Sequence, residues 1–205
     1  MIFNGSIRYD NFLFRGFPVL FKPGQNARNF GNQVAGPVRY SMRSTRNSDQ
    51  GRLDILVNNA TTLHDALTVS GPFWDKPLEL TELWDVGMRS HYVASWHAAP
   101  LLLAAGAGLV VNTSSFGGRI YMHGPAYGAG KAAVDKMSHD MAYDFKPHNV
   151  AVVSLWMGLL LTERSQKVFE AEPEKYAPLM ETIETPEFSG RVIDALAKDP
   201  ALMEK

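Results

Sequence analysis

Three short runs of aliphatic residues stand out against longer stretches of mixed apolar and polar character. They cover residues 53–58, 108–113 and 149–156, and Val, Leu and Ile dominate each of them. Continuous apolar runs of this length are typical of strands that are buried on both faces of a parallel sheet. The pattern therefore predicts three parallel strands.

Two segments with helical periodicity follow the first and second of these runs. One is predicted over residues 82–104, with Thr81 as a suitable N-cap and Pro100 expected to kink it or to begin its last turns. The other is predicted over residues 126–145, where apolar side chains recur every four residues. Residues 62–80 contain three turn-forming Gly and Pro residues and are interpreted as a loop.

The C-terminal part begins with an acidic segment. Residues 163–184 are rich in Glu and only weakly periodic, so a solvated surface is expected there. Thr185 followed by Pro186 predicts the N-cap and the first residue of a last helix, which should stop at residues 199–200. The order strand, helix, strand, helix, strand, helix predicts an α/β sandwich around a parallel sheet with right-handed crossovers.

Residues 1–50 differ in texture from the rest of the chain. No periodicity lasts beyond a turn, and seven Lys or Arg against two Asp give a net charge of +5, which leaves −6 for residues 51–205. Such a segment can be an organelle transit peptide, and the alternative is a poorly ordered or mispredicted tail. The prediction is an atypical segment over residues 1–50 and a partial α/β domain over residues 51–205.

The composition argues against several classes of function. A net charge of −1 gives no overall field that would attract nucleic acid or an anionic membrane. The longest apolar stretch, residues 98–111, is interrupted by proline and glycine, so no transmembrane segment is predicted. The sequence has no cysteine, which excludes disulfides and thiol chemistry, and its six histidines include no i,i+4 pair, so no metal site is predicted.

The candidate chemistry lies between residues 114 and 131. Tyr127 and Lys131 are four residues apart and share one face of the predicted helix. A phenol has a pKa of about 10, and a nearby ammonium group is expected to lower it toward the range useful for acid–base catalysis. Ser114, at the end of the second predicted strand, could donate a hydrogen bond to a developing oxyanion. Asn58 ends the first strand at the same edge of the sheet, where ligands bind in parallel α/β folds.

These residues form a pattern that resembles the short-chain dehydrogenases/reductases. The motif positions are Asn58-Asn59-Ala60, Ser114, Tyr127-x-x-x-Lys131 and Gly158-x-x-x-Thr162. Further similarity, in segments such as GRLDILVNNA and YGAGKAA, points to the dehydrogenase/reductase SDR family member 1 group and covers about residues 48–200. The resemblance implies a Rossmann-like three-layer α/β/α fold.

The resemblance also implies a function, that of an NAD(P)(H)-dependent carbonyl reductase or alcohol dehydrogenase acting on a small-molecule carbonyl or alcohol. Tyr127 would donate or accept the proton, and Lys131 would bind the nicotinamide ribose and lower the pKa of the phenol. Ser114 would bind the substrate oxygen, because it has the family's spacing to the tyrosine, although Ser115 is adjacent.

Further family features are carried over with the resemblance. Asn58 and Ala60 would line the cofactor cleft, with Gly158 and Thr162 beside the nicotinamide. NADP is slightly favoured over NAD. A homodimer or tetramer would form through the helices that start near Glu82 and Ala126. The compartment is not fixed by the sequence; the resemblance suggests cytoplasm or association with the endoplasmic reticulum, with mitochondria as the alternative.

The chain departs from the family pattern at several positions. Thr61 stands where the family has glycine, Met157 where it has proline, and Gly87 where many members have a proton-relay Asn. No Gly-x-x-x-Gly-x-Gly loop, which would bind the cofactor pyrophosphate, precedes residue 51. The expected fold is therefore incomplete, lacking the N-terminal βα units with the Gly-rich loop and the last strand.

Two further functions stay open beside the reductase. The first is a truncated non-catalytic remnant or interaction module that cannot bind dinucleotide. The second is an isomerase or lyase that uses the same tyrosine and lysine with bound NAD, although the short length argues against it.

Overall fold

The computed structural model describes residues 6–8 and 52–204 of the 205-residue chain. In chain order the strands are β1 (Ser6–Arg8), β2 (Ile55–Asn58), β3 (Gly108–Ser114) and β4 (Val150–Trp156). The helices are α2 (Glu82–Trp84), α3 (Ser90–Ala105), α4 (Pro125–Phe145), α5 (Glu163–Ala171), α6 (Pro173–Tyr176) and α7 (Glu187–Lys198). Short 3-10 turns occupy much of residues 65–81, which were predicted as a loop.

The described strands form one parallel sheet in the order β1-β4-β3-β2. The three strands predicted from the sequence are confirmed, with β3 pairing β2 from Leu109 to Asn112 and β4 from Gly108 to Ser114. The short strand β1 was not predicted; it pairs with the free side of β4 and comes from the N-terminal segment. The remaining predictions for residues 1–50 lie outside the described residues.

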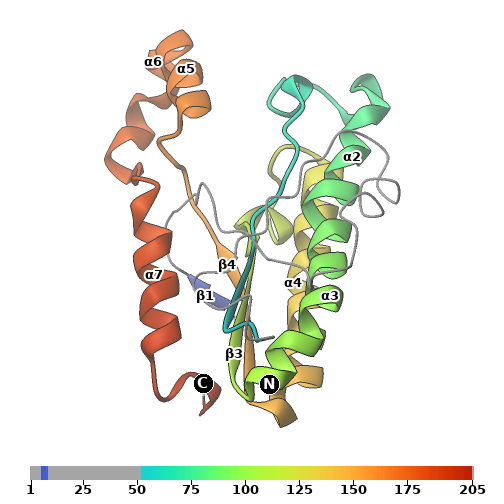
Figure 1. Ribbon diagram of the computed structural model, residues 1–205. Helices are drawn as coiled ribbons and strands as arrows, with labels where there is room; N and C mark the ends of the chain where they lie inside the picture. Colours follow the sequence, from blue (N-terminus) through green and yellow to red (C-terminus); the bar gives the residue numbers. More distant parts are fainter. Residues whose placement is uncertain (1–5, 9–51, 205) are drawn as a thin grey trace.

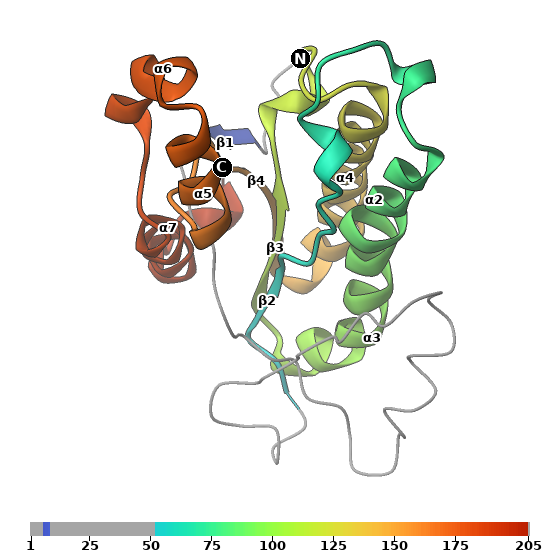
Figure 2. The ribbon, with the colours of Figure 1, turned by 90° about the horizontal axis from the view of Figure 1, so that it is seen from above.

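Helices cover both faces of the sheet, so the predicted three-layer arrangement is confirmed (Figures 1 and 2). On one face α3 and α4 pack against a cluster that includes Leu56, Val110 and Val152. On the other face α7 packs with Val192 and Ile193 on the opposite set of strand residues, among them Leu109, Val111, Val153 and Leu155. The two sets alternate along β3 and β4 because successive side chains of a strand point to opposite faces.

The predicted helix over residues 82–104 is present but contains a local widening. Between α2 and α3 lies the π-helical turn η5 (Asp85–Arg89), with Gly87 buried in its middle. Pro100 lies inside α3, which continues to Ala105 and ends on Gly106 in the left-handed conformation. π-turns of this kind insert one residue into a helix and occur frequently at functional sites.

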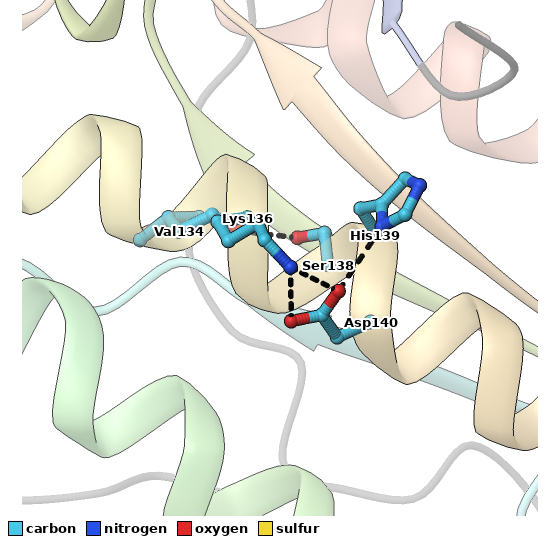
Figure 3. Close-up of polar contacts among 5 residues, drawn as sticks. All are labelled: Val134, Lys136, Ser138, His139 and Asp140. Atoms are coloured by element: carbon cyan, nitrogen blue, oxygen red, sulfur yellow. Dashed lines mark hydrogen bonds and ion pairs between the residues drawn. The ribbon is translucent and has the colours of Figure 1, made fainter.

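Helix α4 begins at Pro125 and has two contrasting faces. Its inner face is buried along Gly130, Val134 and Ser138, and the Ser138 hydroxyl donates to the Val134 carbonyl at 2.7 Å. On the exposed face Lys136 forms an ion pair with Asp140, which also contacts the ring of His139 (Figure 3). These exposed pairs contribute little stability, so burial of the inner face against the sheet holds the helix in place.

The C-terminal region differs from the prediction in two respects. The acidic segment contains α5 and α6, because Thr162 caps α5: its hydroxyl accepts from the backbone N–H of Ser165 at 3.0 Å. Helix α7 has Pro186 rather than Thr185 as its N-cap, one residue later than predicted. No helix among the described residues is long and apolar enough to cross a membrane.

Candidate active site

The carboxyl ends of the strands bring the predicted site residues to one edge of the sheet. Asn58 lies opposite Asn112 in the register of β2 and β3, and Ser114 ends β3 opposite Trp156. Tyr127 lies in the first turn of α4, which follows directly from the loop after β3. The edge therefore joins the ends of β2, β3 and β4 to the start of α4, as parallel α/β folds do at their ligand sites.

The phenol of Tyr127 is largely enclosed by its neighbours. Leu67, Leu80 and Leu83 form a small buried cluster against which its ring packs. The ring of His123 meets it edge-on with centroids 5.1 Å apart. Burial raises the pKa of Tyr127 above its ordinary value of 10.0, and a hydrogen bond with Ser115 opposes that rise. The phenol consequently carries its proton at neutral pH.

The two adjacent serines have different partners. The hydroxyl of Ser114 is buried and donates to the backbone carbonyl of Lys131 at 3.2 Å, which ties β3 to α4. The hydroxyl of Ser115 accepts from the N–H of Gly117 at 3.1 Å, and its interaction with the phenol of Tyr127 lowers the pKa of that phenol. Sequence spacing selected Ser114, but Ser115 is the serine that contacts the tyrosine.

Gly117 allows this close approach. A Cβ atom at this position would come within 2.6 Å of the Tyr127 ring, so any side chain there would displace the phenol or the loop. Glycine therefore lets the loop after β3 lie directly against the ring and keeps Ser115 within reach of the phenol.

Lys131 lies one turn after Tyr127 on α4, and its ammonium group reaches the end of β3. Its ammonium group is 5.8 Å from the centroid of the Tyr127 ring and donates to the Thr113 carbonyl at 3.3 Å. Burial lowers the pKa of Lys131 to about 8, and the nearby Asp135 carboxylate opposes that shift. The prediction that Lys131 lowers the pKa of the phenol is not met in this structure, because burial outweighs any such effect and the pKa of Tyr127 is raised.

Asn58 belongs to a buried polar network rather than projecting into open space. Its amide nitrogen donates to Asn112 Oδ1 at 2.7 Å and to Ser95 Oγ at 3.0 Å. The amide of Asn112 in turn donates to Ser138 Oγ at 2.9 Å. These bonds join β2, β3, α3 and α4, so Asn58 supports the site by fixing the strand ends. Its own backbone carbonyl accepts from Thr113 Oγ1 at 3.3 Å.

His91 is a site residue that the sequence reasoning did not identify. It is fully buried on α3, and its Nε2 lies 3.1 Å from the carbonyl oxygen of Ala60. That oxygen can only accept, so Nε2 carries the proton and Nδ1 has no partner among the described residues. Burial, reinforced by the charge of Lys131, lowers the pKa of His91 to about 4. A lone histidine in a helical pattern does not indicate that its side chain will be buried against the backbone that follows β2.

The remaining predicted residues surround the same edge. Ala60 lies two residues after β2, and its carbonyl oxygen is 3.1 Å from His91 Nε2, whereas Gly158 lies two residues after β4 and is half-buried. The hydroxyl of Thr162 caps α5 and accepts from the backbone of Ser165, so the structure gives it a role in starting that helix. The structure thus brings Tyr127, Lys131 and Ser115 together, with Asn58 and His91 in supporting positions.

Part of this edge fits a nicotinamide nucleotide. The ammonium group of Lys131 has three N–H donors, and its described hydrogen bonds use one of them, on Thr113. Two donors are therefore left for ribose hydroxyls beside a protonated phenol. No Gly-x-x-x-Gly-x-Gly loop for the pyrophosphate precedes residue 51, so the fit concerns the nicotinamide end.

Sequence comparisons agree with this geometry. The family model of the short chain dehydrogenases matches residues 41–173. Dehydrogenase/reductase SDR family member 1 of Mus musculus is 41% identical over 167 residues, which cover 75% of this chain and 52% of that protein. Its Homo sapiens counterpart is 37% identical over 179 residues, which cover 81% and 56%. The chain spans about half the length of these curated relatives.

Solved structures show the same fold at low sequence identity. The structure of ElxO with NADP bound has a TM-score of 0.65 at 22% identity and covers 74% of this chain and 62% of that one. A 3-oxoacyl-[acyl-carrier protein] reductase with bound NAD from Brucella melitensis has a TM-score of 0.60 at 22% identity, with coverage of 73% and 57%. With the family match over residues 41–173, these findings show that the chain belongs to the short-chain dehydrogenase family.

Proposed function

We propose that the chain carries the catalytic half of an NAD(P)(H)-dependent carbonyl reductase or alcohol dehydrogenase. One observation supports this above all: a protonated, half-buried phenol lies beside a serine that lowers its pKa and 5.8 Å from a lysine ammonium, at the carboxyl edge of a parallel sheet. Carbonyl reduction needs a proton donor, a group that stabilises the developing oxyanion, and a cation beside the cofactor ribose. Tyr127, a serine and Lys131 fill these positions.

The reaction divides between the protein and the bound cofactor. A reduced nicotinamide would supply the hydride, and with it both electrons, to the carbonyl carbon. Tyr127 gives its phenolic proton to the carbonyl oxygen, so that the C=O bond becomes CH–OH, and the phenolate then regains a proton from solvent. Lys131 donates to the ribose hydroxyls and stabilises the transient phenolate. Its pKa of about 8 keeps it mostly charged at neutral pH.

Either of two serines could hold the substrate oxygen. Both serines are buried, and Ser114 has the family's spacing to Tyr127, but its hydroxyl donates to the Lys131 carbonyl. Ser115 already interacts with the phenol, so a carbonyl oxygen that accepts from the phenol would also lie beside its hydroxyl. We therefore assign the substrate contact to Ser115 and a positioning role to Ser114.

Cofactor choice and assembly are further parts of the proposal. Asn58, Ala60, Gly158 and Thr162 would frame the nicotinamide end, with Asn58 acting through the strand ends. The family resemblance favours NADP slightly, and the solved structures with the same fold include one with NADP bound and one with NAD bound. A homodimer would form through the outer faces of α3 and α4, which lie on the same side of the sheet (Figures 1 and 2).

The competing proposal is a non-catalytic remnant of the family. For the chain as given, it is favoured because no Gly-x-x-x-Gly-x-Gly loop precedes residue 51, and backbone N–H groups of such a loop provide much of the affinity for dinucleotides. Titration of NADPH and NADH, followed by nicotinamide fluorescence, separates the two proposals. Binding below millimolar concentrations supports the enzyme, whereas no binding at millimolar cofactor supports the remnant.

Given binding, Tyr127→Phe tests the mechanism itself. The variant keeps the ring packing and removes the proton, so carbonyl reduction should fall by about 10²–10⁴-fold while cofactor affinity changes little. The control is Tyr143→Phe, which changes an exposed tyrosine on the same helix and should leave the rate unaltered. Unchanged turnover in Tyr127→Phe would refute the role assigned to Tyr127.

A further inference from the structure

A cavity of about 430 Å³ opens beside the proposed catalytic residues. Its wall includes Phe73 and Trp74 from the turn before α2, Ile120, Tyr121 and Met122 from the loop after β3, and Gly128 from α4. None of the nine described residues that line it is charged. Ligand pockets of this size are typically lined by apolar and aromatic side chains.

The cavity is connected to the catalytic phenol by direct contacts. Gly128 follows Tyr127 in the chain, and the Ser115 hydroxyl lies 4.0 Å from the sulfur of Met122. A Cβ atom on Gly117 would be in contact with both Tyr127 and Met122, at 2.6 Å and 3.4 Å. A carbonyl oxygen held by Ser115 and Tyr127 would thus have its substituent directed along Met122 into the cavity.

The backbone at this point is held in a strained conformation. His123 has a φ of 57°, in the left-handed region that residues other than glycine rarely adopt, and Gly124 follows at 89°. This turn directs the imidazole against Tyr127, while Met122 and Gly124 form part of the cavity wall. Backbone strain of this kind persists at ligand sites when the surrounding structure enforces it.

The rim of the cavity exposes large apolar side chains to solvent. Trp74 is 72% exposed, Tyr121 82%, Phe73 59% and Ile120 56%, and the rings of Phe73 and Trp74 meet edge-on at 5.3 Å. Gathered around one cavity, such residues indicate a binding surface rather than scattered surface apolars. Two cations lie close in the chain to wall residues, Lys76 and Arg119, and neither lines the cavity; the Lys76 ammonium donates to the Leu67 carbonyl at 3.2 Å.

We propose that this cavity binds the ring system of an uncharged aromatic ketone, whose carbonyl group reaches Ser115 and Tyr127. The aromatic rings of Phe73, Trp74 and Tyr121 give flat surfaces for stacking, and the wall offers no counter-ion for a carboxylate or phosphate. This assignment deepens the proposed reductase function and rests on it for the chemistry, but ring binding is a separate property of the chain.

The test measures binding without requiring turnover. The full chain is titrated by calorimetry with 2-acetonaphthone and with 2-naphthoate, which has the same ring system and a negative charge. The ketone should bind at least about tenfold more tightly than the carboxylate, because transferring a carboxylate to an apolar wall without a partner is costly. Equal or tighter binding of 2-naphthoate, or no binding of the ketone, would overturn the proposal.

Three variants locate the site. Trp74→Ala should weaken binding of 2-acetonaphthone by roughly tenfold, and Trp74→Phe, which keeps an aromatic ring, by less than about threefold. Leu78→Ala is the control, because Leu78 is 81% exposed nearby and does not line the cavity. Equal affinities in Trp74→Ala and wild type would place the ring elsewhere and refute the assignment.

Turnover with NADPH then separates the two proposals. If 2-acetonaphthone binds with the expected dependence on Trp74 but is not reduced, the aromatic site stands and the reductase function fails. If small aliphatic ketones are reduced while 2-acetonaphthone does not bind, the reductase stands and the aromatic site fails.

Discussion

Ser114 and Ser115 show how neighbouring side chains of one extended segment come to serve different purposes. Successive side chains along a strand point in opposite directions, and Ser115 continues the extended backbone of β3 with φ −162° and ψ 151°. Ser114 therefore turns toward the backbone of α4, and Ser115 toward the phenol. Spacing in the sequence could not separate them, because the loop from Phe116 to Gly124 fixes which serine meets Tyr127.

Replacing each serine should separate the two roles. Ser115→Ala removes the hydroxyl beside the phenol and should reduce the rate of carbonyl reduction about 10²–10³-fold, as loss of an oxyanion donor does. Ser114→Ala should leave the rate within about tenfold and mainly lower stability, by about 1 kcal/mol for one hydrogen bond. Steady-state rates and urea unfolding measure both effects. A larger loss of rate in Ser114→Ala than in Ser115→Ala would restore the assignment to Ser114.

Lys131 should impose a pH dependence on the reaction. Its pKa is lowered to about 8, so the amine is charged below that pH and becomes neutral as the pH rises through it. Reduction should therefore slow above pH 8, as the ammonium that stabilises the transient phenolate is lost. Lys131→Arg keeps its charge at high pH and should show no such decline, whatever its absolute rate. A wild-type profile that stays flat to pH 10 would contradict this role.

The supporting elements are joined through Asn112, at the centre of the buried network. Asn112→Ala would remove two buried hydrogen bonds, the one that Asn112 accepts from Asn58 and the one that it donates to Ser138, whereas Ser95→Ala would remove one. Each such loss costs about 1–3 kcal/mol, so we expect about 2–4 kcal/mol in the free energy of unfolding. Ser95→Ala is the control and should cost less, because Asn58 keeps Asn112 as an acceptor. Urea unfolding of both variants measures the difference, and equal costs would refute a central role for Asn112.

The central strands of the sheet could be predicted from the sequence more fully than the edge strand β1 and the helix α5. Buried parallel strands leave continuous apolar runs in the sequence, so β2, β3 and β4 were found close to their observed bounds. Strand β1 is three residues long and forms by pairing with β4. No local sequence pattern predicts that pairing. Helix α5 depends on a capping box between Thr162 and Ser165, which the sequence signals only weakly because serine rather than Glu or Gln stands at the third helical position.

The proximity of the candidate site residues was predictable from the sequence, whereas their electrostatics were less so. Tyr127 and Lys131 were found because a four-residue spacing on a helix fixes their mutual position. The direction of the tyrosine's pKa was wrong, because it depends on how completely Leu67, Leu80 and Leu83 enclose the ring, and these come from a stretch interpreted as a loop. Burial of this kind is a property of the assembled fold.

The whole molecule presents a second apolar surface, on the side of the sheet covered by α3 and α4. Trp96 is 65% exposed and Tyr92 53% on α3, and Tyr143 is 80% exposed on α4. Exposed aromatic residues are enriched at protein interfaces, so the proposed homodimer would cover these side chains. The two helices lie on the same side of the sheet, where the proposed homodimer would form (Figures 1 and 2).

Trp96→Glu should therefore convert a dimer into a monomer. Light scattering after size-exclusion chromatography should give twice the chain mass for the wild type at micromolar concentration. In a twofold-symmetric interface the introduced carboxylate would lie near the same carboxylate of the second chain, and the two would repel each other. Loss of a central tryptophan alone costs about 2 kcal/mol or more of binding free energy, so the dimer should weaken at least about thirtyfold. Leu179→Glu, at an exposed position of the 3-10 turn η8 (Ala177–Thr182), is the control and should leave the mass unchanged. A monomeric wild type, or a Trp96→Glu variant that stays dimeric, would show that this surface does not mediate self-association.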